Sequence, residues 1–158
     1  MLTREKIINF IRHEQKTFRN LPDTCVIIGS AGLLLSGLLI PHVSDIDILT
    51  SQRNYEILKD EWKKYIHTND HPDNGKKFES HFFRLNCEGT IVEVMAELFV
   101  NTNDDIWKKV EVTNCNSLIV DDITLYYPTL TESIRLLKLF NRDKDKQKLQ
   151  LIEHTLKA

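Results

Sequence analysis

Residues 25–50 read CVIIGSAGLLLSGLLIPHVSDIDILT, and four features follow one another in this stretch: an apolar run, a glycine-serine pair, a leucine-rich run and a second apolar run. The β-branched residues 25–28 are typical of a buried strand. The glycine-serine pair ends that strand, and the leucine-rich residues 31–39 predict a helix. Residues 46–50 predict a second strand, which begins beside two aspartates.

The uncharged part of this stretch, residues 25–40, is too short to span a membrane. A spanning helix needs ~20 apolar residues, whereas this run is shorter and holds three glycines before it reaches Pro41. We therefore expect a buried strand and a buried helix here, and no membrane partner.

Hydrophobic periodicity predicts the elements in the rest of the chain. Alternating patterns on both sides of the polar residues 86–89 predict a hairpin. The order strand, helix, strand, helix, hairpin predicts an α/β (α+β) fold, in which helices flank a mixed sheet and a helical tail follows. We expect one domain over 1–158, with its core over about 1–127 and its tail over about 129–157. The expected helices cover residues 3–18, 31–39, 52–66, 103–110, 130–140 and 145–156, and the expected strands cover 25–28, 46–50, 81–85, 91–96, 118–120 and 124–126.

Length, charge and cysteine content limit the class of protein. A chain of 158 residues corresponds to about one domain of ~150 residues. Its 21 basic and 23 acidic side chains give a net charge of −2, without the basic excess typical of nucleic-acid binders. Three cysteines without a Cys-x-x-Cys pair predict neither a disulfide framework nor a structural zinc site. Because the N-terminal residues contain no signal-peptide core, we expect a cytoplasmic protein.

The two aspartates at the start of the second strand, Asp45 and Asp47, are the first candidate site. The Asp-x-Asp pattern alone is weak evidence for a site, because roughly one match is expected by chance in this composition, and residues 143–145 form a second match. On a strand, however, the two side chains point to the same face, where their charges repel each other unless a cation lies between them. Mg²⁺ suits such a site, because it prefers oxygen ligands and is often shared with phosphate.

Gly29 and Ser30 provide groups that suit a phosphate beside that cation. They lie where the first strand turns into the helix, and backbone N–H groups at such a turn bind phosphate. Glycine lets the backbone approach a ligand closely. The alternative is that Ser30 only caps the helix and that the two aspartates only end a solvated strand.

Glu93 is a third candidate, because it interrupts the apolar run IVEVM over residues 91–95. A charge inside a buried strand needs a partner or an ion. If its strand lies beside that of Asp45 and Asp47, Glu93 completes an acidic triad. The alternative is an outward-facing residue of an edge strand.

The order GS, SDIDIL and a hairpin ending in IVEVM resembles the nucleotidyltransferase fold of the DNA polymerase β superfamily, and most of all its small bacterial members. The resemblance covers about residues 25–95. It implies that Gly29 and Ser30 contact the phosphates of a nucleotide and that Asp45 and Asp47 bind a divalent metal, Mg²⁺ or Mn²⁺. The third acid of the family aligns with Glu93, although the family often has aspartate there.

The tail extends the resemblance, because KLFNRDKD over residues 138–145 looks like the Lys…Arg-x-Lys-Asp tail helix of many such proteins. On one continuous helix, Lys138, Arg142 and Asp145 would share a face, and Lys138 or Arg142 would neutralise a triphosphate. Lys148 stands where the tail pattern usually has aspartate. The alternative is that these charged residues only form the solvated face of a surface helix and bind no phosphate.

The resemblance implies a nucleotidyltransferase that moves a nucleoside monophosphate from an NTP to an acceptor hydroxyl and releases pyrophosphate. Asp45, Asp47 and Glu93 would be its catalytic residues, and the partners would be the nucleotide and an acceptor, which is a small molecule, a protein or an RNA. Two alternatives stay open: a non-catalytic nucleotide-binding module, and an antitoxin-like protein that binds a separate helical protein.

Overall fold

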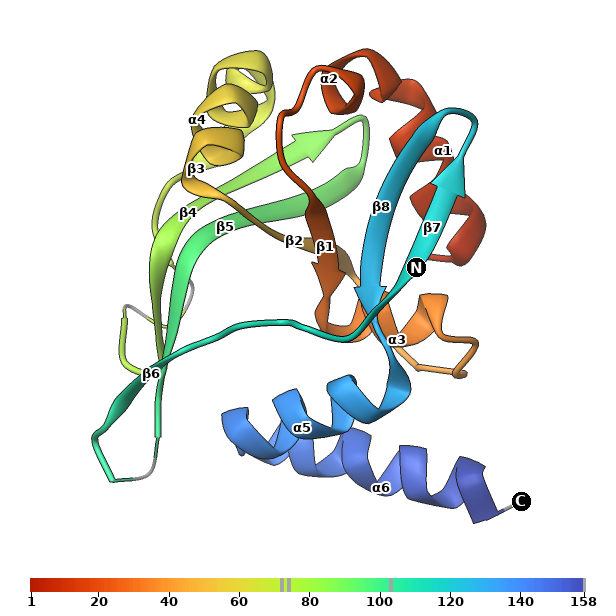
Figure 1. Cartoon of the computed structure of the whole chain (residues 1–158), viewed down its shortest axis with the longest axis vertical. Coiled ribbons are helices and arrows are strands. Elements are labelled where there is room, and N and C mark those ends of the chain that lie inside the picture. Colours follow the sequence, from red (N-terminus) through yellow and green to blue (C-terminus); the bar gives the residue numbers. More distant parts are fainter. Residues whose placement is uncertain (72, 74, 103, 158) are drawn as a thin grey trace.

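A computed structural model describes residues 1–71, 73, 75–102 and 104–157, which fold around one mixed sheet (Figure 1). Within these residues the strand order is β3-β4-β5-β2-β1-β8-β7, and β6 pairs with the far end of β5. The helices are α1 (Arg4–His13), α2 (Gln15–Arg19), α3 (Gly29–Leu35), α4 (Gln52–Glu61), the 3₁₀ turn η1 (Lys63–Tyr65), α5 (Leu130–Phe140) and α6 (Asp143–Lys157). The strands are β1 (Cys25–Ile28), β2 (Asp45–Thr50), β3 (Ile66–Thr68), β4 (Phe78–Cys87), β5 (Thr90–Asn101), β6 (Trp107–Lys109), β7 (Cys115–Val120) and β8 (Ile123–Pro128).

The centre of the sheet combines both strand directions. β1 and β2 are antiparallel, whereas β2 pairs in parallel with β5 and β1 pairs in parallel with β8. The hairpins β4–β5 and β7–β8 extend the sheet on its two sides. The expectation of a mixed sheet flanked by helices is confirmed. Thr3 is the N-cap of α1, and its hydroxyl accepts a hydrogen bond from the N–H of Lys6 at 3.2 Å.

Apolar side chains cover both faces of the sheet, in two clusters. The larger cluster joins Ile46 and Ile48 of β2 to residues of α1, α3 and α4, such as Ile11 and Leu58. The smaller cluster lies on the opposite face, where α5 packs against β4 and β5; it includes Phe82, Met95, Leu136 and Phe140. Figure 1 shows α5 and α6 side by side at one end of the sheet. Because side chains alternate along a strand, Asp45 and Asp47 point to the face of the smaller cluster.

Several of the expected elements differ in the structure. The helix expected over 31–39 begins at Gly29 and ends at Leu35. The helix expected over 103–110 is wrong: residue 103 lies outside the described residues, and Trp107–Lys109 form β6 because β5 continues to Asn101 and offers its edge for pairing. The helix expected over 52–66 ends at Glu61, and its last residues join η1 and β3. The first helix is divided in two at Glu14. None of the helices in the described residues is long and apolar enough to cross a membrane.

Candidate active site

The parallel pairing of β2 with β5 brings together the three acids that the sequence singles out. Asp47 lies opposite Glu93 in the register, and Asp45 lies two residues before Asp47 on the same face. One carboxylate oxygen from each residue lies within 4.8 Å of those of the other two. We call Asp45, Asp47 and Glu93 the acidic triad. Its members lie on neighbouring central strands, so the edge-strand alternative for Glu93 is wrong.

The charges of the acidic triad are poorly compensated. Burial raises the pKa of Asp47 well above its usual value, and the nearby carboxylates of Asp45 and Glu93 raise it further. Burial and Asp45 raise the pKa of Glu93 to about 7. Arg84 of β4 lies opposite Glu93 in the register, and its Nη1 is 3.8 Å from Oε1 of Glu93, which opposes this rise. A cation among the three carboxylates would relieve their repulsion.

Gly29 lies against the acidic triad in a position that favours glycine. The register of β1 with β2 places Ile28 opposite Asp47, so the next residue turns over that carboxylate. The φ of Gly29 is 68°, and a Cβ built on it would lie 2.7 Å from Oδ2 of Asp47. Both the left-handed backbone and the close approach therefore favour glycine.

Ser30 follows Gly29 in the first turn of α3. The N-cap of α3 is Ile28, and no side chain caps this helix, so the alternative that Ser30 is only an N-cap is wrong. Ser30 is half-buried and lines the same cavity as the acidic triad. Its hydroxyl is therefore available to a ligand in that cavity.

The acidic triad, Gly29 and Ser30 form one wall of a cavity of about 830 Å³. The C-terminal helices close the cavity from the other side, where Phe140 packs in the smaller apolar cluster and α6 presents polar side chains. The cavity thus combines oxygen donors, cationic groups and apolar surface. Its remaining lining residues are Ile28, Ile40, Pro41, His42, Ser44, His71, Asp73, Phe78, Arg84, Met95, Leu98, Arg142, Lys144, Gln147, Lys148 and Leu151.

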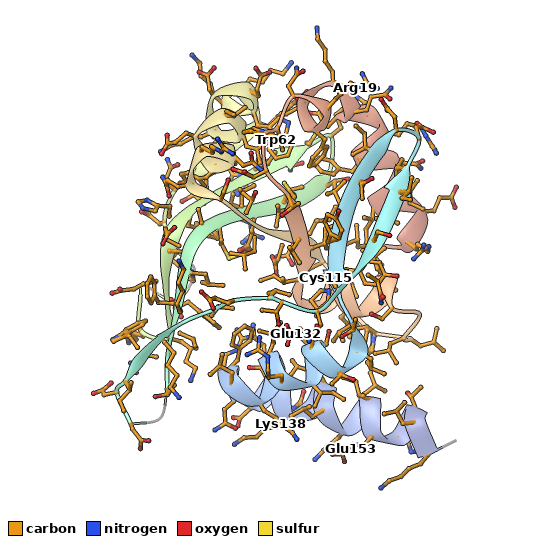
Figure 2. The ribbon with its side chains drawn as sticks, viewed as in Figure 1. Arg19, Trp62, Cys115, Glu132, Lys138 and Glu153 are labelled. Atoms are coloured by element: carbon orange, nitrogen blue, oxygen red, sulfur yellow. The ribbon has the colours of Figure 1, made fainter. Side chains whose placement is uncertain are left out.

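The two cationic residues expected from the tail do not share a helix face. Asn141 adopts a left-handed backbone with φ 55° and ends α5, so the condition of one continuous helix through residues 138–145 is not met. Lys138 is exposed and absent from the cavity lining, and Figure 2 shows it on the side of the C-terminal helices away from the sheet. Arg142 does line the cavity, but its Nε and Nη2 donate to both carboxylate oxygens of Asp145, at 2.7 and 2.9 Å.

Lys144 and Lys148 are the cavity residues that sequence reasoning misses. They lie one turn apart on α6 and both line the cavity. Their positive charges oppose the rise in the pKa of Asp47, and burial lowers the pKa of Lys148 itself. Their spacing of four residues was a usable signal, because such residues share a helix face. Arg84 also follows from the sequence, once the hairpin register pairs it with Glu93.

His71 is another cavity residue that the sequence does not identify. Its Nδ1 lies 3.0 Å from Oδ1 of Asp73, and its ring packs against Phe82 with the centroids 5.0 Å apart. Asp73 is held in turn by backbone N–H donors, those of Gly75, Lys77 and Phe78. The wall of the cavity beside β4 is therefore aromatic and includes one imidazole.

Two solved structures share this fold over nearly the whole chain. The protein TM1012 from Thermotoga maritima, described as a candidate nucleotidyltransferase, superposes with a TM-score of 0.72 at 20% sequence identity, over 98% of this chain and 96% of its own. The lincosamide antibiotic adenylyltransferase LnuA, solved with lincomycin bound, superposes with a TM-score of 0.58 at 8% identity, over 96% of this chain and 97% of its own. No family model matches the sequence, and no curated protein matches it significantly.

At these identities the similarity concerns the fold. The neighbours agree with the resemblance carried by Gly29-Ser30, Asp45-x-Asp47 and Glu93, and with the sheet that brings these residues together. The chain therefore has the nucleotidyltransferase fold.

Proposed function

We propose that this chain is a nucleotidyltransferase that moves a nucleoside monophosphate from an NTP to an acceptor hydroxyl, with Mg²⁺ or Mn²⁺ as its cofactor. The observation that carries the proposal is the acidic triad beside Gly29, on the wall of a cavity that two lysines face from α6. The two structural neighbours support it, because both are described as transferases of this kind.

The acidic triad fits a hard divalent cation. Its donor set is entirely carboxylate oxygen, the chemistry that Mg²⁺ and Mn²⁺ favour over the nitrogen and sulfur ligands typical of zinc. Asp45, Asp47 and Glu93 would hold the ion, and the raised pKa of Asp47 reflects negative charge that such an ion would balance. When bound, the ion supplies positive charge to the carboxylates and to the phosphate oxygens.

The protein groups around the acidic triad suit a triphosphate. Lys144 and Lys148 would donate to phosphate oxygens from α6 and offset their negative charge. The hydroxyl of Ser30 would donate from the opposite wall, where Gly29 leaves the backbone open to a close approach. Arg142 would contribute less than the sequence implies, because Asp145 already occupies its guanidinium.

Glu93 would accept the proton of the acceptor hydroxyl. Glu93 lies two positions along the same face from the residue that pairs with Asp45, and Arg84 lies beside its carboxylate, with Nη1 3.8 Å from Oε1. The hydroxyl oxygen would form a bond to the α-phosphorus of the NTP. The bond from that phosphorus to the bridging oxygen would break, and pyrophosphate would leave.

The first test is nucleotide binding by calorimetry, with ATP and GTP, in the presence and absence of Mg²⁺. We expect binding that depends on Mg²⁺ and that Asp47→Asn abolishes. Asp143→Asn is the matched control, because Asp143 belongs to the other Asp-x-Asp sequence, is exposed and does not line the cavity. An equal loss of binding in both variants, or binding that ignores Mg²⁺, would contradict the proposal.

The second test is pyrophosphate release in the presence of candidate acceptors of the three classes. Release with one acceptor class, abolished by Asp45→Asn, would establish turnover. Metal-dependent binding without release to any acceptor would instead favour the non-catalytic module. Absence of nucleotide binding altogether would favour the antitoxin-like alternative, whose test is a stable complex with a separate helical protein.

A further inference from the structure

A second cluster of metal-ligating side chains lies on the opposite face of the sheet from the cavity. Cys87 is the last residue of β4, and its side chain belongs to the larger apolar cluster. His13 ends α1, and Glu14 occupies the junction between α1 and α2. One ligand atom from each of the three lies within 4.8 Å of those of the other two. The cluster thus joins the N-terminal helices to the tip of the hairpin.

The donor atoms of this cluster differ in kind from those of the acidic triad. They are a thiol sulfur, an imidazole nitrogen and a carboxylate oxygen, the three donor types that zinc sites combine. Cys87 is 4% exposed, and the side chain of Glu14 is 13% exposed. A carboxylate held against a buried thiol beside an imidazole forms a mixed site that suits a borderline-soft cation better than Mg²⁺.

The distances between the ligand atoms approach those of a tetrahedral site. With metal bonds of about 2.3 Å to sulfur and about 2.0–2.1 Å to nitrogen and oxygen, neighbouring ligand atoms lie about 3.3–3.6 Å apart. Sγ of Cys87 is 4.0 Å from Oε1 of Glu14, and Nδ1 of His13 is 3.5 Å from Oε2 of the same carboxylate. The ligand atoms of Cys87 and His13 lie within 4.8 Å of each other, so the site would contract when it binds the ion.

Glu88 lies beside the other ring nitrogen of His13. It follows Cys87 in the hairpin turn with φ 51°, and its Oε2 lies 3.7 Å from Nε2 of His13. The lone pairs of the two ring nitrogens point away from each other, so an ion bound at Nδ1 beside Glu14 is out of reach of Glu88. The protein ligands are therefore His13, Glu14 and Cys87, and a water molecule would complete the tetrahedral coordination of a Zn²⁺ ion.

We propose that His13, Glu14 and Cys87 form a Zn²⁺ site that fastens the junction of α1 and α2 to the β4–β5 hairpin. That hairpin carries Arg84 and Glu93 on its other face, so the zinc ion would hold the strands of the cavity from behind. The expectation drawn from the missing Cys-x-x-Cys pair concerns only ligands that lie close together in the sequence. The ligands come from two distant segments, and only the packing of α1 on the sheet brings them together.

The test is a titration of the full chain with Co²⁺, which replaces Zn²⁺ and reports its ligands by absorption. We expect a thiolate-to-cobalt charge-transfer band, and displacement of Co²⁺ by Zn²⁺. The band should vanish in Cys87→Ser and persist in Cys115→Ser, whose half-buried thiol lies outside the cluster. It should also persist in Asp47→Asn, which removes a ligand from the all-oxygen site. No band in the wild-type protein, or a band unchanged in Cys87→Ser, would overturn the proposal.

Zn²⁺ affinity by calorimetry provides the second measurement. His13→Asn changes a side chain that is 49% exposed, so the variant should fold even if the buried Cys87 tolerates no change. We expect its affinity for Zn²⁺ to fall by at least about 100-fold, beyond the 10–100-fold that losing an outer-shell partner costs. Wild-type protein with free Zn²⁺ at about 100 times the Kd should melt about 5–10 °C higher. An affinity equal in His13→Asn and wild type, or an unchanged melting temperature, would refute the site.

Discussion

Gly29→Ala should disable the candidate active site while leaving the fold intact, because the added methyl group meets a carboxylate of the acidic triad. The new Cβ would lie 2.7 Å from Oδ2 of Asp47, and ordinary contact begins at 3.4 Å. The carboxylate must therefore retreat by about 0.7 Å, the difference between the two distances. A misplacement near 1 Å costs about 10²-fold in rate in well-organised sites, so we expect kcat/KM to fall by about 30–100-fold.

The same substitution also carries a backbone cost, and Gly37→Ala separates the two effects. Gly29 has φ 68° and Gly37 has φ 90°, so alanine at either position pays about 1–2 kcal/mol for a left-handed conformation. A Cβ on Gly37, however, meets nothing within 4 Å. Both variants should lose similar thermal stability, whereas only Gly29→Ala should lose activity.

Mn²⁺ affinity, measured by electron paramagnetic resonance, gives a result that needs no acceptor. We expect Gly29→Ala to bind Mn²⁺ about 10-fold or more weakly than Gly37→Ala, because displaced Asp47 no longer completes the ligand set. Affinities within about twofold of each other would refute the reasoning, since they would show that Asp47 moves without consequence or holds no metal. Mn²⁺ should be added at concentrations that do not saturate the protein, so that the signals of free and bound manganese are both visible.

Three further predictions concern the cavity and its supports. Lys148→Gln should weaken ATP binding by about 10-fold in calorimetry, because it loses a charge-assisted hydrogen bond to phosphate. Lys138→Gln should leave ATP binding unchanged, because Lys138 is exposed outside the cavity. Equal effects of the two variants would contradict the placement of Lys148 inside the cavity and of Lys138 outside it. Mg²⁺ affinity should fall as the pH drops below about 7, because protons on Glu93 then compete with the ion, and a flat profile from pH 8 to 5 would contradict the raised pKa. Glu132 accepts bonds from the backbone N–H groups of Thr113 and Asn114 and pairs with Arg135, so Glu132→Gln should cost about 2–3 kcal/mol in urea unfolding at pH 7. These contacts lower the pKa of Glu132 to about 2, so its contribution to folding stability is complete above the unfolded-state pKa near 4.5 and is lost as the pH falls toward 2. A stability difference between Glu132→Gln and wild type that grows on acidification would refute this role of the Glu132 charge.

Glu132 has this effect because of where it lies in the fold. Figure 2 shows it on α5, under the segment that connects β6 to β7. Its side chain is only 2% exposed, and it ties that connecting segment to the helix that packs on the cavity face. The charge is therefore structural, although its burial alone would suggest a catalytic role.

The acidic triad was predictable because its information is local. Asp45 and Asp47 share a face in any strand with a period of two, and Glu93 interrupts a run that is otherwise apolar. What the sequence leaves open is which strands pair. The parallel register that sets Asp47 opposite Glu93 depends on a connection that passes through α4 and β4, and no local pattern encodes it.

The cationic wall was not predictable in the same way, because it depends on how one helix ends. A single residue, Asn141, takes a left-handed conformation and reverses the helical path after α5. On a continuous helix, Lys138 and Arg142 would share a face. With the break, Lys138 stays exposed on α5, the chain after Asn141 takes a new direction, and α6 places Lys144 and Lys148 in the cavity lining. Asparagine tolerates that conformation better than most residues, so the sequence contains the signal but does not require its use. The packing of Phe140 into the apolar cluster beneath β4 and β5 selects the broken path, because it fixes the end of α5 against the sheet. The placement of positive charge opposite the acidic triad is thus a consequence of apolar packing on the cavity face rather than of the charged residues themselves.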